Sequence, residues 1–166
     1  MKQSIKVLGV PDDINSSFMR GPSAAPPIIR EALYSDSSNL FSESGLNLDQ
    51  DGIWEDLGDI EFSGEVAVEN FNKIKTFVKD VLASDQKLVS LGGDHSVSWP
   101  ILDAHFDIWG TLDILHIDAH PDLYDNLLDN KLSHASPFAR IMETGRVNRL
   151  VQVGIRTLNK HQAEQA

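Results

Sequence analysis

Residues 113–122 read DILHIDAHPD, an apolar run followed at once by polar residues. The first five positions have the length and hydrophobicity of a buried β-strand. Asp118, His120 and Asp122 follow that strand at intervals of two. In an extended chain, side chains at i, i+2 and i+4 point to one side, so we expect these three to converge. Open α/β sheets bind ligands beyond the carboxyl ends of their strands, which is where these residues lie.

Short apolar strands alternate with amphipathic helices along the rest of the chain. Strands are expected at 5–10, 53–57, 87–91, 113–117 and 150–155, and helices at 26–33, 66–82, 97–106 and 137–144. Such a βαβ series predicts a three-layer α/β/α fold with a mainly parallel sheet and helices on both faces. The sequence contains no obvious linker, so residues 1–166 are expected to form one domain.

The residues after the central strand suit a divalent metal ion. Carboxylates and imidazole without thiolate favour an ion such as Mn²⁺, and the chain has no cysteine. A carboxylate shared by two ions would suit two-metal hydrolysis. The alternative is a polar loop whose aspartates cap backbone amides, but the histidine between Asp118 and Asp122 favours metal binding. His116 has the same parity but lies within the apolar run, and we interpret it as a satisfied sheet histidine.

Two further histidines are candidates for the same site. Gly92-Gly93 permits a sharp turn after the strand at 87–91, which would direct His95 toward Asp118 if that strand neighbours 113–117. His134 lies in a loop before Ser136-Pro137, and a loop histidine can transfer protons near neutral pH. An ordinary surface histidine is an equal alternative for His134.

The composition narrows the classes of partner. Fourteen basic and 25 acidic residues give a formal charge of −11, which argues against nucleic acid or an anionic membrane as partner. It is compatible with a small cationic substrate. The apolar run at 5–10 is too short for a signal-peptide core, and no run approaches the length of a membrane span. We therefore expect a cytoplasmic protein.

Together these motifs resemble the ureohydrolase family, which comprises the arginases and agmatinases. GGDHS at 92–96 and DAHPD at 118–122 are similar to two signature motifs of that family. The similarity extends over RGPSAAPPIIREA at 20–32, SHASPFARIME at 133–143 and QVGIR at 152–156. With Tyr124-Asp125, these segments look most like plant-type arginases and their bacterial relatives. The resemblance implies an arginase-like fold.

The resemblance also implies an activity and a set of metal ligands. Such enzymes use two Mn²⁺ ions to hydrolyse a guanidino compound, such as arginine or agmatine, to urea and an amine. A metal-bridging hydroxide would attack the guanidinium carbon. His95 and Asp122 would hold one ion and His120 the other, while Asp118 would bridge both.

Two other residues receive roles from the resemblance. His134 matches the histidine that shuttles protons in the family. Tyr124 stands where well-known arginases carry an asparagine that contacts the carboxylate of the amino acid, which makes it a candidate substrate-binding residue. The choice among arginine, agmatine and another guanidino compound stays open.

The family has a second metal motif, Asp-x-Asp, far downstream of the first, and no Asp-x-Asp follows Asp122 in these 166 residues. We therefore expect the chain to represent the N-terminal part of a ureohydrolase domain, with weak metal binding and little activity alone. The resemblance implies a trimer or hexamer for the complete enzyme. Two alternatives are a formiminoglutamase or guanidino-acid hydrolase of the same superfamily, and a non-catalytic remnant that serves as a binding or scaffold module.

Overall fold

The computed structural model describes residues 4–50 and 53–165. Its strands are β1 (Ile5–Val10), β2 (Trp54–Asp59), β3 (Lys87–Gly92), β4 (Leu112–Ile117) and β5 (Val147–Val153). Its α-helices are α1 (Ala25–Leu33), α2 (Ala67–Ala83), α3 (Ser98–Trp109), α4 (Pro137–Glu143) and α5 (Lys160–Gln165). Short 3₁₀ turns lie at Pro22–Ala24 and His95–Val97.

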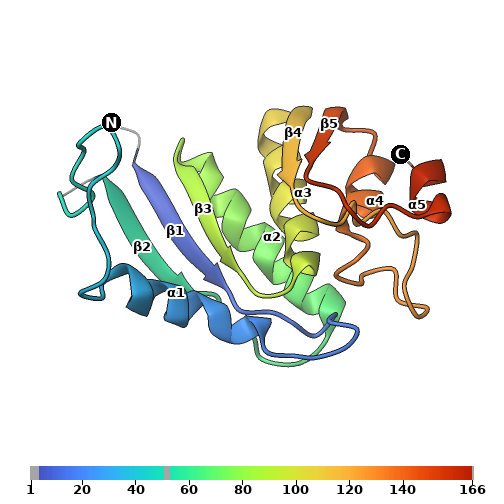
Figure 1. The fold of residues 1–166 in the computed structure, drawn as a ribbon, viewed down its shortest axis with the longest axis horizontal. Coiled ribbons are helices and arrows are strands. Elements are labelled where there is room, and N and C mark those ends of the chain that lie inside the picture. The colour runs from blue at the N-terminus through green and yellow to red at the C-terminus, as the bar shows by residue number, and fades with distance from the viewer. Residues whose placement is uncertain (1–3, 51–52, 166) are drawn as a thin grey trace.

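The strands form two parallel sheets. One sheet has the order β2-β1-β3, and the other pairs β4 with β5. The register sets His116 of β4 opposite Gln152 of β5. Strands β3 and β4 are not paired with each other, and Figure 1 shows the two sheets side by side with α2 and α3 behind them. The condition under which the sequence would direct His95 toward Asp118, that the strands at 87–91 and 113–117 are neighbours, is therefore not met.

Side chains of β1 alternate between the two faces of the larger sheet, and helices cover both faces. Leu8 and Val10 are fully buried and belong to the same core cluster as Ile74 and Val78 of α2. The opposite face of this sheet lies toward α1, on the other side from α2 (Figure 1). The adjacent apolar residues Val7 and Leu8 of β1 lie on opposite faces of the strand, as expected for a parallel sheet that is covered on both faces. The expectation of parallel sheets with flanking helices is confirmed here.

The smaller sheet is covered on one face. Phe106 of α3 and Phe138 and Ile141 of α4 form a second core cluster against it. On the other face, the side chains of Leu115 and Ile117 are 63% and 74% exposed. Because parallel sheets are normally buried on both faces, an exposed apolar face is unusual for such a sheet.

Several local expectations need correction. Strand β5 begins at Val147 rather than at 150, and helix α5 was not expected from the sequence. Ser136, the N-cap residue of α4, makes no side-chain capping hydrogen bond, and its hydroxyl oxygen is buried without a hydrogen-bond partner among the described residues. Within those residues, no helix has both the length and the apolar character needed to cross a membrane.

Candidate metal centre

A tight turn after β3 positions His95. Gly93 lies so close to the backbone of Asp12 that a Cβ atom would overlap the Asp12 carbonyl group. The amide of Asp94 donates to that same carbonyl oxygen at 2.9 Å. The carboxylate of Asp94 then accepts a hydrogen bond from the amide of Ser96 at 2.8 Å, which begins the 3₁₀ turn. This turn places His95 beside Asp122, in the loop after β4.

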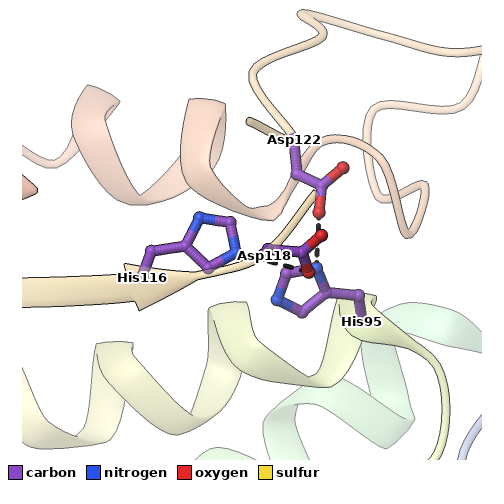
Figure 2. A group of neighbouring side chains, drawn as sticks. All are labelled: His95, His116, Asp118 and Asp122. Carbon is purple, nitrogen blue, oxygen red and sulfur yellow. Dashed lines mark hydrogen bonds and ion pairs between the residues drawn. The ribbon is translucent and has the colours of Figure 1, made fainter. Parts of the chain in front are cut away.

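His95 meets the residues that follow β4. Its Nδ1 atom lies 2.5 Å from Oδ2 of Asp122. One ligand atom from each of His95, Asp118 and Asp122 lies within 4.8 Å of the others, and the imidazole of His116 belongs to the same group. Figure 2 shows the four side chains pointing toward one another from β4, the loop after it and the turn after β3. The expected approach of His95 to Asp118 therefore occurs although β3 and β4 are not paired.

His120 occupies a separate position beside Asp118. Its Nδ1 atom lies 3.2 Å from Oδ1 of Asp118, and its side chain is 61% exposed. The loop is not extended, because the amide of His120 turns back to donate to Asp118 Oδ1 at 2.8 Å and Asp122 has a φ of 49°. The three side chains line one cavity, but the alternation of an extended chain, which we gave as the reason, is wrong. Instead, Asp118 lies between two groups of possible metal ligands. One group contains His95, His116 and Asp122, and the other contains His120.

The surroundings of Asp118 favour its charged form. Burial raises the pKa of this carboxyl group, but hydrogen bonds from His120 and the nearby His95 outweigh burial and leave the pKa below its usual value. A carboxylate that stays ionised is a suitable ligand for a divalent cation. The backbone is also fixed, because the amide of Asp118 donates to the carbonyl of Val153 at 3.0 Å.

One cavity of about 300 Å³ joins the residues singled out from the sequence. The lining residues are His95, Asp118, His120, Asp122, Tyr124, His134, Ala135, Thr157 and Gln162. All six candidate site residues from the sequence therefore face a common space. The cavity can hold a small molecule beside the carboxylates.

His134 and Tyr124 are each fixed at this cavity by neighbours. Nδ1 of His134 lies 3.2 Å from the carbonyl oxygen of Asn15, so this nitrogen can donate to it and leave Nε2 free to exchange a proton. The ring of Tyr124 stacks on that of His161 at 5.7 Å between centroids. Its hydroxyl oxygen accepts a hydrogen bond from Asn159 at 2.5 Å.

The interpretation of His116 as fully satisfied is wrong. Its side chain is buried, and the ring of Phe138 stacks on it at 4.0 Å between centroids. Gln152 contacts Nδ1 at 2.9 Å, but Nε2 has no hydrogen-bond partner among the described residues. Burial and the nearby His95 hold the pKa of His116 below its usual value.

Sequence reasoning missed residues that support the site from distant parts of the chain. Asn15 supplies the carbonyl group beneath His134, and Gln152 contacts His116. Gln162 of α5 accepts a hydrogen bond from the amide of Leu123 at 3.3 Å. The polar Gln152 within an apolar strand was the one available signal, because a polar side chain there needs a partner.

The donor set fits a pair of divalent ions. Three imidazoles and two carboxylates lie in two groups, and Asp118 has one oxygen 3.6 Å from His116 Nε2 and the other 3.2 Å from His120 Nδ1. No thiolate is present, and oxygen with imidazole suits ions of the manganese type. The fold and the site together define an α/β protein with a candidate two-metal centre of the kind that hydrolytic enzymes use.

Comparison with known proteins identifies the family. The model of the arginase family matches residues 3–166, and the chain belongs to this family. It is 45% identical to "Arginase 1, mitochondrial" of Oryza sativa subsp. indica over 99% of this chain and 51% of the relative. It is 36% identical to "N(1)-aminopropylagmatine ureohydrolase" of Thermus thermophilus over 94% of this chain and 52% of that protein. The relatives are ureohydrolases, so this is an enzyme family.

Solved structures confirm the arginase-like fold. The arginase of Medicago truncatula matches with a TM-score of 0.93 and 44% identity, over 98% of this chain and 54% of that one. A putative agmatinase of Clostridium difficile matches with a TM-score of 0.89 and 26% identity, over 98% and 58% of the two chains. The chain thus spans about half the length of the relatives that it matches.

The expected cytoplasmic location is contradicted by the same comparison. The rice relative is named as mitochondrial, and a relative 43% identical from Arabidopsis thaliana is named "Arginase 2, chloroplastic/mitochondrial". The expectation rested on the lack of a secretory signal pattern. Such a pattern distinguishes secreted from non-secreted proteins and carries no information about organelles.

Proposed function

We propose that this chain takes part in the Mn²⁺-dependent hydrolysis of a guanidino compound to urea and an amine. The observation that carries the proposal is the arrangement around Asp118, whose two oxygens face His116 and His120 at 3.6 and 3.2 Å. His95 and Asp122 complete the first group, and His120 belongs to the second. Membership of the arginase family supports the substrate class.

Each candidate residue has a defined part in this proposal. His95 and Asp122 would hold one ion, His120 the other, and Asp118 would contact both. Two bound divalent cations would supply activation of a water molecule and neutralisation of negative charge that develops in the reaction. The four side chains leave open positions around two ions that favour about six donors, so further ligands must complete the centre.

The remaining steps concern the substrate and its protons. Water adds to the guanidinium carbon, the bond from that carbon to the alkyl nitrogen breaks, and a proton must reach the departing amine. His134 faces the cavity with Nδ1 near the Asn15 carbonyl, so its Nε2 atom is the candidate proton carrier. Tyr124 lies at the same cavity and would contact the far end of the substrate.

The half-length match bears on the activity of the chain. We propose that residues 1–166 form the N-terminal part of a ureohydrolase domain and that the C-terminal half supplies the missing ligands through an Asp-x-Asp motif. The 166 residues alone then bind Mn²⁺ weakly and release little urea. We also propose that the complete enzyme is a homo-oligomer, either a trimer or a hexamer. Light scattering would measure its molar mass and so its oligomeric state.

The test is release of urea with Mn²⁺ and either arginine or agmatine. The chain is assayed alone and after co-expression with the second half of the Medicago truncatula arginase, whose structure it matches. We expect restored urea release in the second case and its loss in His134→Asn. The exposed Asp113 of β4 provides a control, because Asp113→Asn should leave activity unchanged.

A complemented protein that binds Mn²⁺ but releases no urea from either substrate contradicts the proposed reaction. The test also separates arginine from agmatine. Hydrolysis of a formimino compound instead would favour formiminoglutamase, and binding without any hydrolysis would favour the non-catalytic module.

A further inference from the structure

We propose that His116 is a positioning residue, which Gln152 holds in the Nε2–H tautomer so that it donates a hydrogen bond to Asp118. The inference rests on the proposed function, in which Asp118 is the carboxylate that would contact both metal ions. It assigns roles to two residues that the ligand set leaves out.

The orientation of Gln152 follows from the carbonyl group of Pro121. Nε2 of Gln152 lies 2.7 Å from that carbonyl oxygen, which can only accept a hydrogen bond. The amide nitrogen must therefore face Pro121, since an amide oxygen there would repel the carbonyl. The same nitrogen lies 2.9 Å from Nδ1 of His116. Its two hydrogens thus have two acceptors, and Nδ1 is one of them.

This arrangement determines the position of the proton on His116. A neutral imidazole has one donor and one acceptor nitrogen, so a ring that accepts at Nδ1 carries its hydrogen on Nε2. Nε2 is buried and lies 3.6 Å from Oδ2 of Asp118, with no hydrogen-bond partner among the described residues. A buried donor without a partner is costly, and a small rotation of the Asp118 carboxylate would provide one.

The contact with Gln152 also makes His116 a poor metal ligand. A ligand role needs a lone pair on Nε2, which would leave the hydrogen on Nδ1 facing the amide hydrogens of Gln152. The pairing of β4 with β5 sets His116 opposite Gln152, and Phe138 stacks on the ring, so it cannot easily turn away. Residues that orient metal ligands in this way commonly contribute 10–100-fold to metal affinity.

The first test locates the proton without any metal. Long-range ¹H–¹⁵N correlation spectra of the metal-free 166-residue chain should show His116 protonated on Nε2 and unprotonated on Nδ1. Gln152→Glu replaces the donor with an acceptor and should move the proton to Nδ1 or protonate both nitrogens. Asn148→Asp, on the exposed edge of β5, adds the same charge and should change neither nitrogen. A wild-type ring protonated on Nδ1 alone overturns the proposal.

The second test measures Mn²⁺ affinity by calorimetry. His116→Phe keeps a ring without a donor and should weaken binding about 10–100-fold. In His116→Gln the amide nitrogen can occupy the position of Nε2, and it should restore most of the affinity. His116→Asn places its amide nearer the position of Nδ1 and should not. Equal affinities for the Gln and Asn variants, with equal melting temperatures, would contradict a donor role.

The two tests separate this inference from the proposed function. If the complemented protein binds Mn²⁺ but releases no urea, the proposed function fails, and the spectra still decide the inference. The Nε2 proton of His116 should then be slow to exchange in the wild type and fast in Asp118→Ala. An unchanged exchange rate would show that no hydrogen bond joins the two side chains.

Discussion

Nδ1 of His95 lies 2.5 Å from Oδ2 of Asp122, although the two residues follow strands of different sheets. The contact depends on the turn after β3 and on the left-handed backbone of Asp122, with φ of 49°. Neither feature lies in a strand or an α-helix. The candidate metal centre is therefore held by turns, while the sheets fix where these turns begin.

Removing the shared carboxylate should weaken both metal positions. Asp118→Asn keeps the size of the side chain but loses the charge that faces both groups of donors. We expect the Mn²⁺ affinity to fall by at least about tenfold in calorimetry. Asp113→Asn removes an equal charge from β4 in an exposed ion pair with Arg149 and should have little effect. Equal losses in both variants would point to a general electrostatic effect.

The turn before His95 should tolerate one glycine substitution and not the other. A Cβ atom at Gly93 would overlap the backbone of Asp12, whereas at Gly92 it would lie 3.4 Å from Val97 Cγ2. Gly93→Ala should therefore lower the melting temperature and abolish Mn²⁺ binding by displacing His95. Gly92→Ala should retain most of both. Normal binding by a folded Gly93→Ala variant would mean that the turn does not determine the site.

The α2 helix should be sensitive at its buried face. Ile74 is fully buried in the larger core, so Ile74→Ala should cost about 2–5 kcal/mol of unfolding free energy. Val68 lies on the same helix with 58% exposure, and Val68→Ala should cost no more than about 0.5 kcal/mol. Denaturant titrations of the two variants measure the difference. Similar values would mean that α2 does not pack on β1 as described.

An ion network between α2, α3 and the residue before β5 should make stability depend on pH. Asp107 lies 3.0 Å from Arg146 and 3.1 Å from Lys75, and these contacts, with Arg146 the larger cause, lower its pKa from 3.8 to about 2. A carboxyl group with a lowered pKa stabilises the fold above its unfolded pKa and loses this effect as the pH falls through its folded pKa.

Asp107→Asn should therefore lower the melting temperature at pH 7 by about 2–4 °C, for a contribution on the order of 1 kcal/mol. The difference from the wild type should shrink between pH 3.8 and about 2, where the wild-type carboxyl group becomes protonated. Melting curves at several pH values check this. A difference that is unchanged at low pH would show that Asp107 acts through packing rather than charge.

Local patterns in the sequence predicted much of the fold. Apolar runs located β1 and β4, and the helical period located α2, because burial enforces these patterns over several residues. The pairing of strands was not predictable in the same way. Whether β3 lies next to β4 depends on the whole sheet, and no local pattern in either strand contains that information.

At the candidate site, too, the residues could be predicted from the sequence but their arrangement could not. The composition of DAHPD at 118–122 indicated metal-binding side chains, but the alternation rule assumed an extended chain. The hydrogen bond from the His120 amide to Asp118 folds the loop back, so alternation does not apply. The open nitrogen of His116 depends on a glutamine 36 residues away, a long-range contact that no local pattern reveals.

The most direct test of the metal centre is anomalous X-ray scattering from Mn²⁺ in crystals of the 166-residue chain. We expect manganese within bonding distance of His95 Nδ1 and Asp122, and a second manganese beside His120 Nδ1, with Asp118 in contact with both. Manganese bound elsewhere, or none near Asp118 in crystals saturated with the ion, would contradict it.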